Sequence, residues 1–373
     1  MTKLSVDEKA GLSSAARRAC TRWEDESSSG AATTDEGVSD PDFGLPLWNV
    51  LCHQVGVASI GIPEALGGAG HGVAAQAIVG HELGRVLAPV PYLASAVLAT
   101  ELLVAGEAPA DLIASLASGD VTAAAVLSTQ HKFSRKRHPI AAWRRNSGWT
   151  LNGTAQHVLH GAIADYLVVA ADVGSETAIF LVSTLEQGVS VDSENVLDRT
   201  RPMATVTFTK APAHRLAPRR SGRGLIDRCL QRALAVLSAE QVGACERLLE
   251  LATEYARNRE QFGRPIGSFQ AVKHRCTNML VELEMARSAS MAAVQAVSDG
   301  SPEASWRANM AKAVCSEALR ECAHANLQIH GGIGFTAEHS AGKFVKRART
   351  DEVLFGPPGE HWDRLATKAR LFA

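Results

Sequence analysis

The sequence predicts an α+β protein in which two helical parts flank a middle antiparallel β domain. Apolar residues recur at helical spacing in the first and last thirds of the chain, whereas short runs of β-branched and aromatic residues occupy the middle. We therefore expect an N-terminal α-helical domain at residues 1–118, a β-barrel domain at 119–216 and a C-terminal four-helix-bundle domain at 217–373. With 373 residues, the chain is long enough to bury several cores.

The N-terminal part is rich in Ala and Leu and has one polar interruption. Residues 24–42 are mostly Ser, Thr, Asp, Glu and Gly, a composition too polar to pack into a core, so we expect a loop there. The segment Ile60–Glu64 leads into a glycine turn at Gly67–Gly70. Helices are expected from Val73 to Gly84 and, after a break marked by two prolines, from Ala94 to Val104.

The middle part carries short strand-like runs separated by turn signals. Asn152–Gly153 and Gln187–Gly188 are dipeptides typical of turns between strands. The predicted strands lie at residues 121–127, 149–151, 166–170, 178–182 and 204–208. Strands this short and closely spaced suit an antiparallel barrel or sandwich.

Long helices return after the basic linker Arg219–Gly224. A single apolar stripe, interrupted only at Gln241, predicts the first of them. The stripe is formed by Leu230, Leu234, Leu237, Ala244, Leu248, Leu251 and Tyr255. A second helix is expected to begin near Phe269, and a third to run from about Ser301 to about Ile329, where two glycines end it. Together these helices predict a bundle.

The composition excludes several classes of function. Lys and Arg number 38 and Asp and Glu number 39, so no strong overall field attracts nucleic acid or an acidic membrane. No apolar run reaches the roughly 20 residues of a membrane-spanning helix, and the N-terminus carries no signal sequence. The seven cysteines include no C-x-x-C pair, and the histidines form no metal-binding motif. We therefore expect a cytoplasmic protein with reduced thiols that binds no metal, membrane or nucleic acid.

Two segments of the C-terminal part carry the most specific pattern in the chain. Residues 259–270 read R-E-Q-F-G-R-P-I-G-S-F-Q, and residues 328–335 read Q-I-H-G-G-I-G-F. Together they resemble the two signature segments of the acyl-CoA dehydrogenase family, R-x-Q-F-G-x-P-I-x-x-F-Q and Q-I-x-G-G-x-G-F, in the family's order. The succession of helical, β and helical parts also agrees with that family, so the resemblance covers roughly residues 45–373.

The resemblance implies FAD as the cofactor and a binding site shared between subunits. In this family the two segments of one subunit hold the ADP half of an FAD whose flavin ring lies in the neighbouring subunit. The residue types suit that task, because a pyrophosphate binds guanidinium groups and backbone N–H donors, and adenosine binds an apolar wall and an amide. The cofactor-binding candidates are Arg259, Phe262, Gln270, Gln328, Gly331 and Gly332.

Two features of the family are missing, and the first is the loop that holds the flavin ring. The family's T-E-P-x-x-G-S-D loop aligns with Leu127–Ser134, which contains neither Glu-Pro nor Gly-Ser-Asp. The family's W-I-T-N segment is replaced by His157–His160. The chain's own flavin pocket is therefore expected to be incomplete.

The second missing feature is the catalytic base. The family assigns removal of the acyl α-proton to a glutamate downstream of the Gly-Gly segment, while a hydride leaves the β-carbon for the flavin. Phe355 occupies that position here, and Ala233 occupies the position at which some members carry the glutamate instead. Neither side chain accepts a proton, so we expect no catalytic residue in this chain.

Because it lacks both features, the chain resembles the smaller, base-lacking subunit of the heteromeric α2β2 acyl-CoA dehydrogenases of bacterial steroid and cholesterol catabolism. The segment Leu87–Leu93 also resembles the sequences of those subunits. The resemblance implies an FAD-cradling subunit that is inactive alone and takes part in α,β-desaturation of an acyl-CoA. Its expected partners are a homologous subunit that carries the catalytic Glu, a steroid-derived acyl-CoA substrate, and electron-transfer flavoprotein as the acceptor.

Two other hypotheses remain open at this point. In the first alternative, the chain is a self-sufficient acyl-CoA dehydrogenase with an unconventional base, Glu352 or Glu360. In the second, the chain is a flavin-free scaffold or binding protein of the same fold. Retention of Arg259, Gln328 and the Gly-Gly turn argues against the scaffold. The basic segment from Lys132 to Arg145 either contacts the phosphates of coenzyme A or an acidic partner, or forms a solvated hairpin edge, which is the simpler interpretation.

Overall fold

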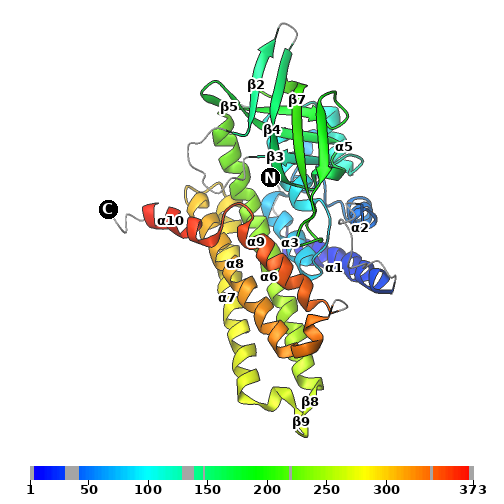
Figure 1. Ribbon diagram of the computed structural model, residues 1–373, viewed down its shortest axis with the longest axis vertical. Coiled ribbons are helices and arrows are strands. Elements are labelled where there is room, and N and C mark those ends of the chain that lie inside the picture. The colour runs from blue at the N-terminus through cyan, green and yellow to red at the C-terminus, as the bar shows by residue number, and fades with distance from the viewer. Residues whose placement is uncertain are drawn as a thin grey trace. The chain divides into compact units, whose positions relative to one another are not determined.

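The computed structural model of the chain describes residues 4–29, 42–127, 138–145, 148–217, 221–336 and 339–368. The chain divides into two compact units. The first comprises Met1–Ala19, Glu36–Gln76 and Pro89–Ala233, and the second comprises Cys20–Asp35, Ala77–Ala88 and Leu234–Ala373. Helices, then strands, then long helices follow one another along the chain, as predicted (Figure 1). The three-domain division at residues 118 and 216 stays a prediction.

Helices make up the N-terminal part of the chain. They are α1 (Val6–Ser29), α2 (Leu45–Val50), the π-helical turn η1 (Leu51–Val55), the 3₁₀ turn η2 (Glu64–Leu66), α3 (Gly72–Arg85), the π-helical η3 (Tyr92–Ala99), α4 (Thr100–Ala105) and α5 (Ala110–Ser118). Helix α3 confirms the helix predicted from Val73 to Gly84. The segments η3 and α4 together cover the helix predicted from Ala94 to Val104.

Helix α1 shows that the loop predicted at 24–42 was wrong in its first part. The helix continues to Ser29. Arg22 and Glu26, four residues apart, form an ion pair at 2.8 Å, and such pairs support a helix whose residues are too polar to be held by a core. The rest of that tract, at 30–41, lies outside the described residues.

Within the described ranges, seven strands form one sheet in the middle part of the chain. They are β1 (Ala123–Val126), β2 (Ile140–Arg145), β3 (Gly148–Leu159), β4 (Tyr166–Val173), β5 (Glu176–Ser183), β6 (Val189–Ser193) and β7 (Met203–Arg215), with the 3₁₀ turn η4 (Gly161–Ile163) after β3. The order is β1-β4-β2-β3-β7-β5, and β5 also pairs with β4, so the sheet closes into a barrel. Most pairings are antiparallel, as predicted, but β1 and β2 each run parallel to β4.

Strands β2 and β6 were not predicted from the sequence. Among the described strands, β6 pairs with β7 alone, and all its side chains are exposed or half-buried, so it lacks the alternation of a strand with one buried face. Strand β2 ends in the exposed Arg144 and Arg145, which pair with the start of β3 in a hairpin. Residues 132–137 lie outside the described part of the chain, so the role of the basic segment stays a prediction.

Long helices form most of the second unit. They are α6 (Gly222–Asn258), which begins in the first unit, and α7 (Gln270–Ser298), α8 (Ala304–His330), α9 (Ala341–Val353) and α10 (Pro358–Lys368). Short segments join them, namely β8 (Glu260–Gln261), β9 (Arg264–Pro265), η5 (Ile266–Ser268) and η6 (Gly331–Phe335). Helices α6 to α9 contribute Leu248, Leu283, Leu319 and Phe344 to one apolar core. The predicted helical bundle is therefore confirmed.

The interruption of the apolar stripe on α6 has a structural reason. Gln241 is fully buried, and its amide donates a hydrogen bond to the Ser316 hydroxyl of α8 at 3.1 Å. The same hydroxyl accepts a hydrogen bond from Nζ of the buried Lys312 at 2.8 Å. The interrupted position therefore carries a polar side chain whose amide nitrogen is hydrogen-bonded within the core.

The structure bears on three expectations from the composition, which concern the cysteines, membrane spans and metal sites. All seven cysteines are free thiols, of which six are buried and Cys276 is half-buried. No helix in the described ranges combines the length and the hydropathy that a membrane span requires. The described His, Cys, Asp and Glu side chains form no group of three that could hold a metal ion.

Candidate functional site

A tight turn follows α6 and carries the first predicted segment. Strands β8 and β9 pair around Phe262 and Gly263, whose φ values of 56° and 75° are typical of the two-residue turns that hairpins favour. The Phe262 side chain is 92% exposed and meets the Phe269 ring edge-on, with ring centroids 6.0 Å apart. The Arg264 guanidinium lies 4.2 Å from the centre of the Phe269 ring. The hairpin therefore presents an uncovered aromatic side chain.

An aromatic stack joins the end of α6 to the end of α8. The Tyr255 ring stacks on the His330 ring, with centroids 4.4 Å apart. The His330 Nδ1–H donates to the Asn326 carbonyl at 2.9 Å, which fixes the orientation of the ring. Tyr255 lies one helical turn before Arg259, and His330 directly precedes Gly331, so the stack holds both predicted segments at one end of the bundle.

Arg259 has a fixed backbone and an exposed side chain. Its N–H donates to the Tyr255 carbonyl at 2.8 Å, and its own carbonyl accepts a hydrogen bond from the Ile266 N–H at 2.8 Å. Within the described part of the chain, its guanidinium has no hydrogen bond or ion pair. All five N–H donors of the group are therefore available to a ligand.

The two glycines after α8 leave open space around their backbones. A Cβ added at Gly331 or at Gly332 would meet no atom within 4 Å. Gly331 has a φ of 61° and a ψ of −139°, a conformation that side chains rarely adopt, so the local backbone requires a glycine there. Gly332 has no positive φ, so nothing within the described chain requires a glycine at that position. Its backbone is open to close approach from outside.

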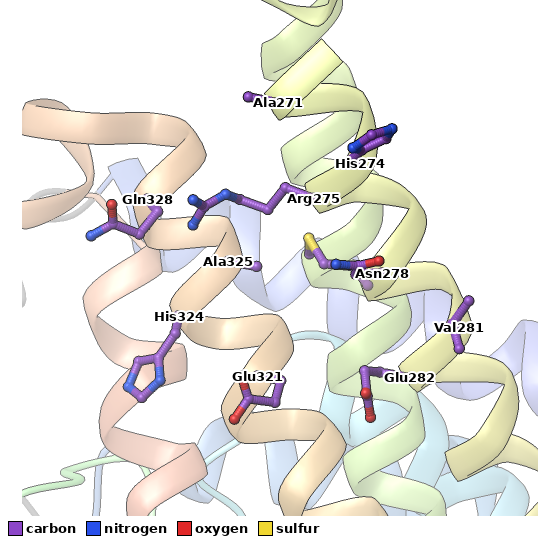
Figure 2. Close-up of a pocket in the computed structure, with 11 residues that line it drawn as sticks. Ala271, His274, Arg275, Asn278, Val281, Glu282, Glu321, His324, Ala325 and Gln328 are labelled. Carbon is purple, nitrogen blue, oxygen red and sulfur yellow. The ribbon is translucent and has the colours of Figure 1, made fainter.

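A groove of about 470 Å³ between α7 and α8 contains Gln328 (Figure 2). The polar side chains that line it are His274, Arg275, Asn278, Glu282, Glu321, His324 and Gln328. The Arg275 side chain extends from α7 toward α8, on the side where Gln328 lies (Figure 2). Gln270, at the start of α7, places its amide nitrogen 2.8 Å from Nε2 of His274. Of the six predicted cofactor residues, Gln328 alone lines this groove, and the other five lie around the same end of the bundle.

Phe355 lies in the turn between α9 and α10. Only 8% of the residue is exposed, and its φ of 59° is followed by a φ of 104° at Gly356. His361 of α10 is fully buried and donates from Nδ1 to the Asn309 side-chain oxygen at 2.7 Å. Burial and nearby positive charges lower the pKa of His361 to about 3, so the ring is neutral. A buried phenyl ring therefore occupies this turn, and the neutral imidazole of His361 lies beside it.

Two carboxylates flank the turn and differ in how they are held. Glu352 forms ion pairs with Arg320 at 2.9 Å and with Arg349 at 2.6 Å. Burial alone would raise the pKa of Glu352, but hydrogen bonds from the two guanidinium groups lower it below its usual value. Glu360 has one long ion pair at 4.0 Å, and its Oε2 lies 3.3 Å from the position that a Cβ on Gly356 would take. Glu360 is therefore a weakly paired carboxylate beside the turn.

Ala233, the second position considered for a base, is fully buried on α6 in the first unit. The neighbouring Arg232 forms an ion pair with Glu101, and its Nε–H donates to the Gln76 side-chain oxygen at 2.7 Å. Arg232, Glu101 and Gln76 are all buried. The carboxylate near Ala233 is therefore committed to an internal ion pair.

The segments aligned with the family's flavin-holding loops are described only in part. Residues 128–134 lie outside the described ranges. In the other segment, Nδ1 of His157 lies 2.6 Å from a carboxylate oxygen of Glu194, and His160 is buried with a φ of 50°. The incompleteness of the chain's own flavin pocket stays a prediction.

Two family models match most of the chain. The model described as acyl-CoA dehydrogenase, C-terminal domain, matches residues 220–369, and the corresponding N-terminal domain model matches residues 15–120. The acyl-CoA dehydrogenase IpdE2 of Mycobacterium tuberculosis is 36% identical over 338 residues, which cover 91% of this chain and 91% of that protein. The chain belongs to the acyl-CoA dehydrogenase family.

Two similar solved structures are each named for a pair of proteins. A chain of the ChsE4-ChsE5 complex from Mycobacterium tuberculosis matches with a TM-score of 0.85 at 27% identity, over 100% of both chains. A chain of a variant of the Tcur3481-Tcur3483 steroid ACAD matches with a TM-score of 0.83 at 26% identity, over 97% of both chains. FAD is the cofactor of this family. The chain is therefore a member of a family of flavoprotein oxidoreductases.

The acyl-CoA dehydrogenase segments of this chain fit the ADP half of FAD. Arg259 offers a guanidinium without an internal partner, and Phe262 offers an uncovered ring. Gly332 is the strongest indication of a phosphate site, because its backbone is open and the surrounding chain does not require a glycine at this position. A glycine in that situation suits a place where a phosphate approaches the backbone closely.

The sequence prediction missed the residues that hold this end of the bundle together. Tyr255 was assigned only to the apolar stripe, and His330 only to a variable position of the second segment. A signal was available, since Tyr255 lies four residues before Arg259 and thus on the same side of α6. Arg275 was missed because nothing in the sequence pairs it with Gln328 on another helix.

Proposed function

We propose that this chain is the FAD-cradling subunit of a heteromeric, FAD-dependent acyl-CoA dehydrogenase that desaturates the α,β bond of a steroid-derived acyl-CoA. The proposal depends most on a contrast within the second unit. Phe355 is buried at the family's base position, whereas Arg259 and Gly332 are open to a ligand. The heteromeric state and the substrate class are supported by the similar structures, which are named as a ChsE4-ChsE5 complex and a Tcur3481-Tcur3483 steroid ACAD.

In this assignment the residues of the chain bind the cofactor and take no part in bond making. Arg259 donates charge-assisted hydrogen bonds to the pyrophosphate, and the open backbone at Gly331 and Gly332 lets phosphate oxygens approach. Phe262 provides an apolar face for adenosine, and the Gln328 amide provides a hydrogen-bonding group. When bound, the cofactor supplies a hydride acceptor for the acyl β-carbon. A glutamate of the homologous subunit takes the α-proton, and electron-transfer flavoprotein is the expected electron acceptor.

A second candidate function is a self-sufficient acyl-CoA dehydrogenase with Glu360 as its base. The observation in its favour is the position of the Glu360 carboxylate beside Gly356, with only a long ion pair to hold it. Glu352 is the weaker candidate, because two guanidinium groups hold its carboxylate and keep its pKa low. A carboxylate stabilised in this way is a poor proton acceptor at neutral pH.

The test compares the chain alone with the complex recovered from its native cell through a tag on this chain. The complex should contain a homologous subunit, show flavin absorbance and oxidise acyl-CoA. The chain alone, given FAD, acyl-CoA and an artificial electron acceptor, should show no turnover. A rate of about 1 per second or more from the chain alone would contradict the proposal.

Two further outcomes separate the other hypotheses. Glu360→Gln in the complex should leave turnover unchanged, whereas a loss of turnover would support Glu360 as the base. A complex without flavin absorbance would support the flavin-free scaffold.

A further inference from the structure

Helix α3 crosses α6 at a point where the two backbones touch. A Cβ added at Gly84 of α3 would lie 1.9 Å from the Glu240 carbonyl oxygen of α6. A Cβ added at Gly243 of α6 would lie 2.0 Å from the His81 carbonyl oxygen of α3. No side chain fits at such distances, so the close approach of the helices requires both glycines. His81 therefore lies at the crossing itself.

Helix α3 depends on its contacts for its stability. Residues 77–88 pack within the second unit, although the chain directly before and after them belongs to the first unit. The helix contains Gly80 and Gly84 in its interior, and glycine stabilises an isolated helix less than alanine does. A helix with little stability of its own responds to changes in the contacts that dock it. The side chains at the crossing therefore matter for how firmly α3 is held.

Carboxylates face both ring nitrogens of His81. Nε2 lies 2.9 Å from Oε2 of Glu246 on α6, and Nδ1 lies 3.5 Å from Oε1 of the buried Glu82 on α3. A neutral imidazole carries one N–H, so in that state one of its nitrogens presents a lone pair to a carboxylate. The protonated ring can donate from both nitrogens. The arrangement therefore fits a charged imidazolium better than a neutral ring.

Guanidinium groups from α3 and α7 complete the surroundings of His81. Arg85 of α3 pairs with Glu250 of α6 at 2.7 Å and lies 3.6 Å from Oε1 of Glu246. Arg287 of α7 lies 3.7 Å from Oε2 of Glu246, the oxygen that faces His81. His81 is thus the nearest partner of Glu246 within the described chain. Because guanidinium groups stay charged, His81 is the member of this cluster whose charge changes near neutral pH.

We propose that His81 is a pH-sensitive latch that holds α3 on α6, closed while the imidazole is protonated and weakened once the proton is lost. The inference concerns the folded chain itself and does not rest on the proposed function. Burial by itself lowers the pKa of His81, but hydrogen bonds to Glu246 and Glu82 outweigh burial and raise the pKa above its ordinary value of 6.5. The latch is therefore fully closed below pH 6.5, and its contribution to stability is lost as the pH rises through the raised pKa.

Hydrogen exchange of the α3 amides in the full chain tests the latch. From about pH 6 to about pH 9, the protection factors of α3, taken relative to those of α8, should fall about five- to thirtyfold in the parent. The His81→Gln variant should show the low value at both pH values, because its side chain has no charge to lose. His53→Gln, at an exposed position of η1, is the matched control and should behave like the parent. Equal pH dependences of α3 protection in the parent and in His81→Gln would overturn the inference.

Titration of the His81 ring by NMR identifies the partner of the latch. The ring signals of His81 are those absent from the spectrum of His81→Gln, and their pKa in the parent should lie above 6.5. Glu246→Gln should lower this pKa, because the amide keeps the shape of the side chain without its charge. Glu250→Gln is the control and should lower it less, since Glu250 pairs with Arg85. A parent pKa at or below 6.5, or a pKa that Glu246→Gln leaves unchanged, would contradict the latch.

Discussion

Arg259 and Phe355 differ in how much the surrounding chain constrains them. Arg259 has its backbone tied by two hydrogen bonds while its guanidinium stays in solvent, so a ligand can use its donors without breaking an internal contact. Phe355 is buried in a left-handed conformation, which costs a non-glycine residue on the order of 1 kcal/mol and persists only where packing enforces it. A carboxylate at that buried point would need a compensating partner.

Arg259→Ala should weaken FAD binding without disturbing assembly. The substitution removes charge-assisted hydrogen bonds worth about 1.5 to 3 kcal/mol, which corresponds to a roughly 10- to 150-fold higher dissociation constant for FAD. The complex should purify at normal stoichiometry but paler, and regain activity with excess FAD. Arg257→Ala, at an exposed position in the last turn of α6, is the control and should leave the constant unchanged. An unchanged constant in Arg259→Ala would mean that this segment does not touch the cofactor.

His361 should make the folded chain sensitive to acid. The pKa of His361 is about 3 in the folded chain, against an ordinary value of 6.5, because burial and the charges of Lys312 and Arg364 oppose protonation. The unfolded chain therefore takes up the proton first, so this contribution to stability is present above pH 6.5 and is lost as the pH falls toward 3. Between pH 7 and pH 5 the loss is about 2 kcal/mol.

Urea unfolding at the two pH values measures this effect. Between pH 7 and pH 5, the free energy of unfolding should fall further in the parent chain than in the His361→Gln variant. The difference between the two decreases should be about 2 kcal/mol. Parallel pH dependences of parent and variant would show that His361 is not the responsible group.

Among the elements, those with an apolar stripe were the most predictable. The first long helix was expected from the spacing of Leu230 to Tyr255, and the third was expected to end near Ile329, one residue from its observed end. Strand β6 was missed because its side chains are largely exposed, so no alternation reveals it. The end of α1 was missed because its residues are polar and include an exposed ion pair, so composition alone does not distinguish this part of the helix from a loop.

The two segments of the candidate site were predictable from the sequence, but their three-dimensional arrangement was not. The motifs identified Arg259 and Gly331, yet they do not show that Tyr255 and His330 hold the two segments together. That contact joins residues on different helices, and its existence depends on how the helices pack. The position of Glu360 beside Gly356 likewise depends on α10 beginning directly after the turn.

The end of α8 offers a matched pair of glycine substitutions. Gly332→Ala should change the free energy of unfolding by less than about 0.5 kcal/mol, because the added Cβ meets no atom of the chain. It should nevertheless weaken FAD binding about tenfold or more, since the methyl group occupies the space that a phosphate approaches. Gly331→Ala should weaken FAD binding and also destabilise the chain by roughly 1 kcal/mol or more, because its φ of 61° disfavours alanine. Equal effects of both substitutions on stability would contradict this account.

For the whole molecule, the proposed division of roles sets the number of cofactors. A tetramer with two copies of this chain and two homologous subunits should contain two flavins, because only the homologous subunit is expected to have a complete loop for the flavin ring. Flavin absorbance against protein concentration from amino-acid analysis measures the ratio. Four flavins per tetramer would show that this chain has a working flavin pocket of its own.

The exposed methionines on α7 make one face of this helix sensitive to oxidation. Met285 and Met291 are 55% and 66% exposed, and peroxide converts an exposed thioether into a polar sulfoxide. Within the described chain, both side chains are therefore accessible to an oxidant. The added oxygen would make this face of α7 more polar without disturbing the buried core of the bundle.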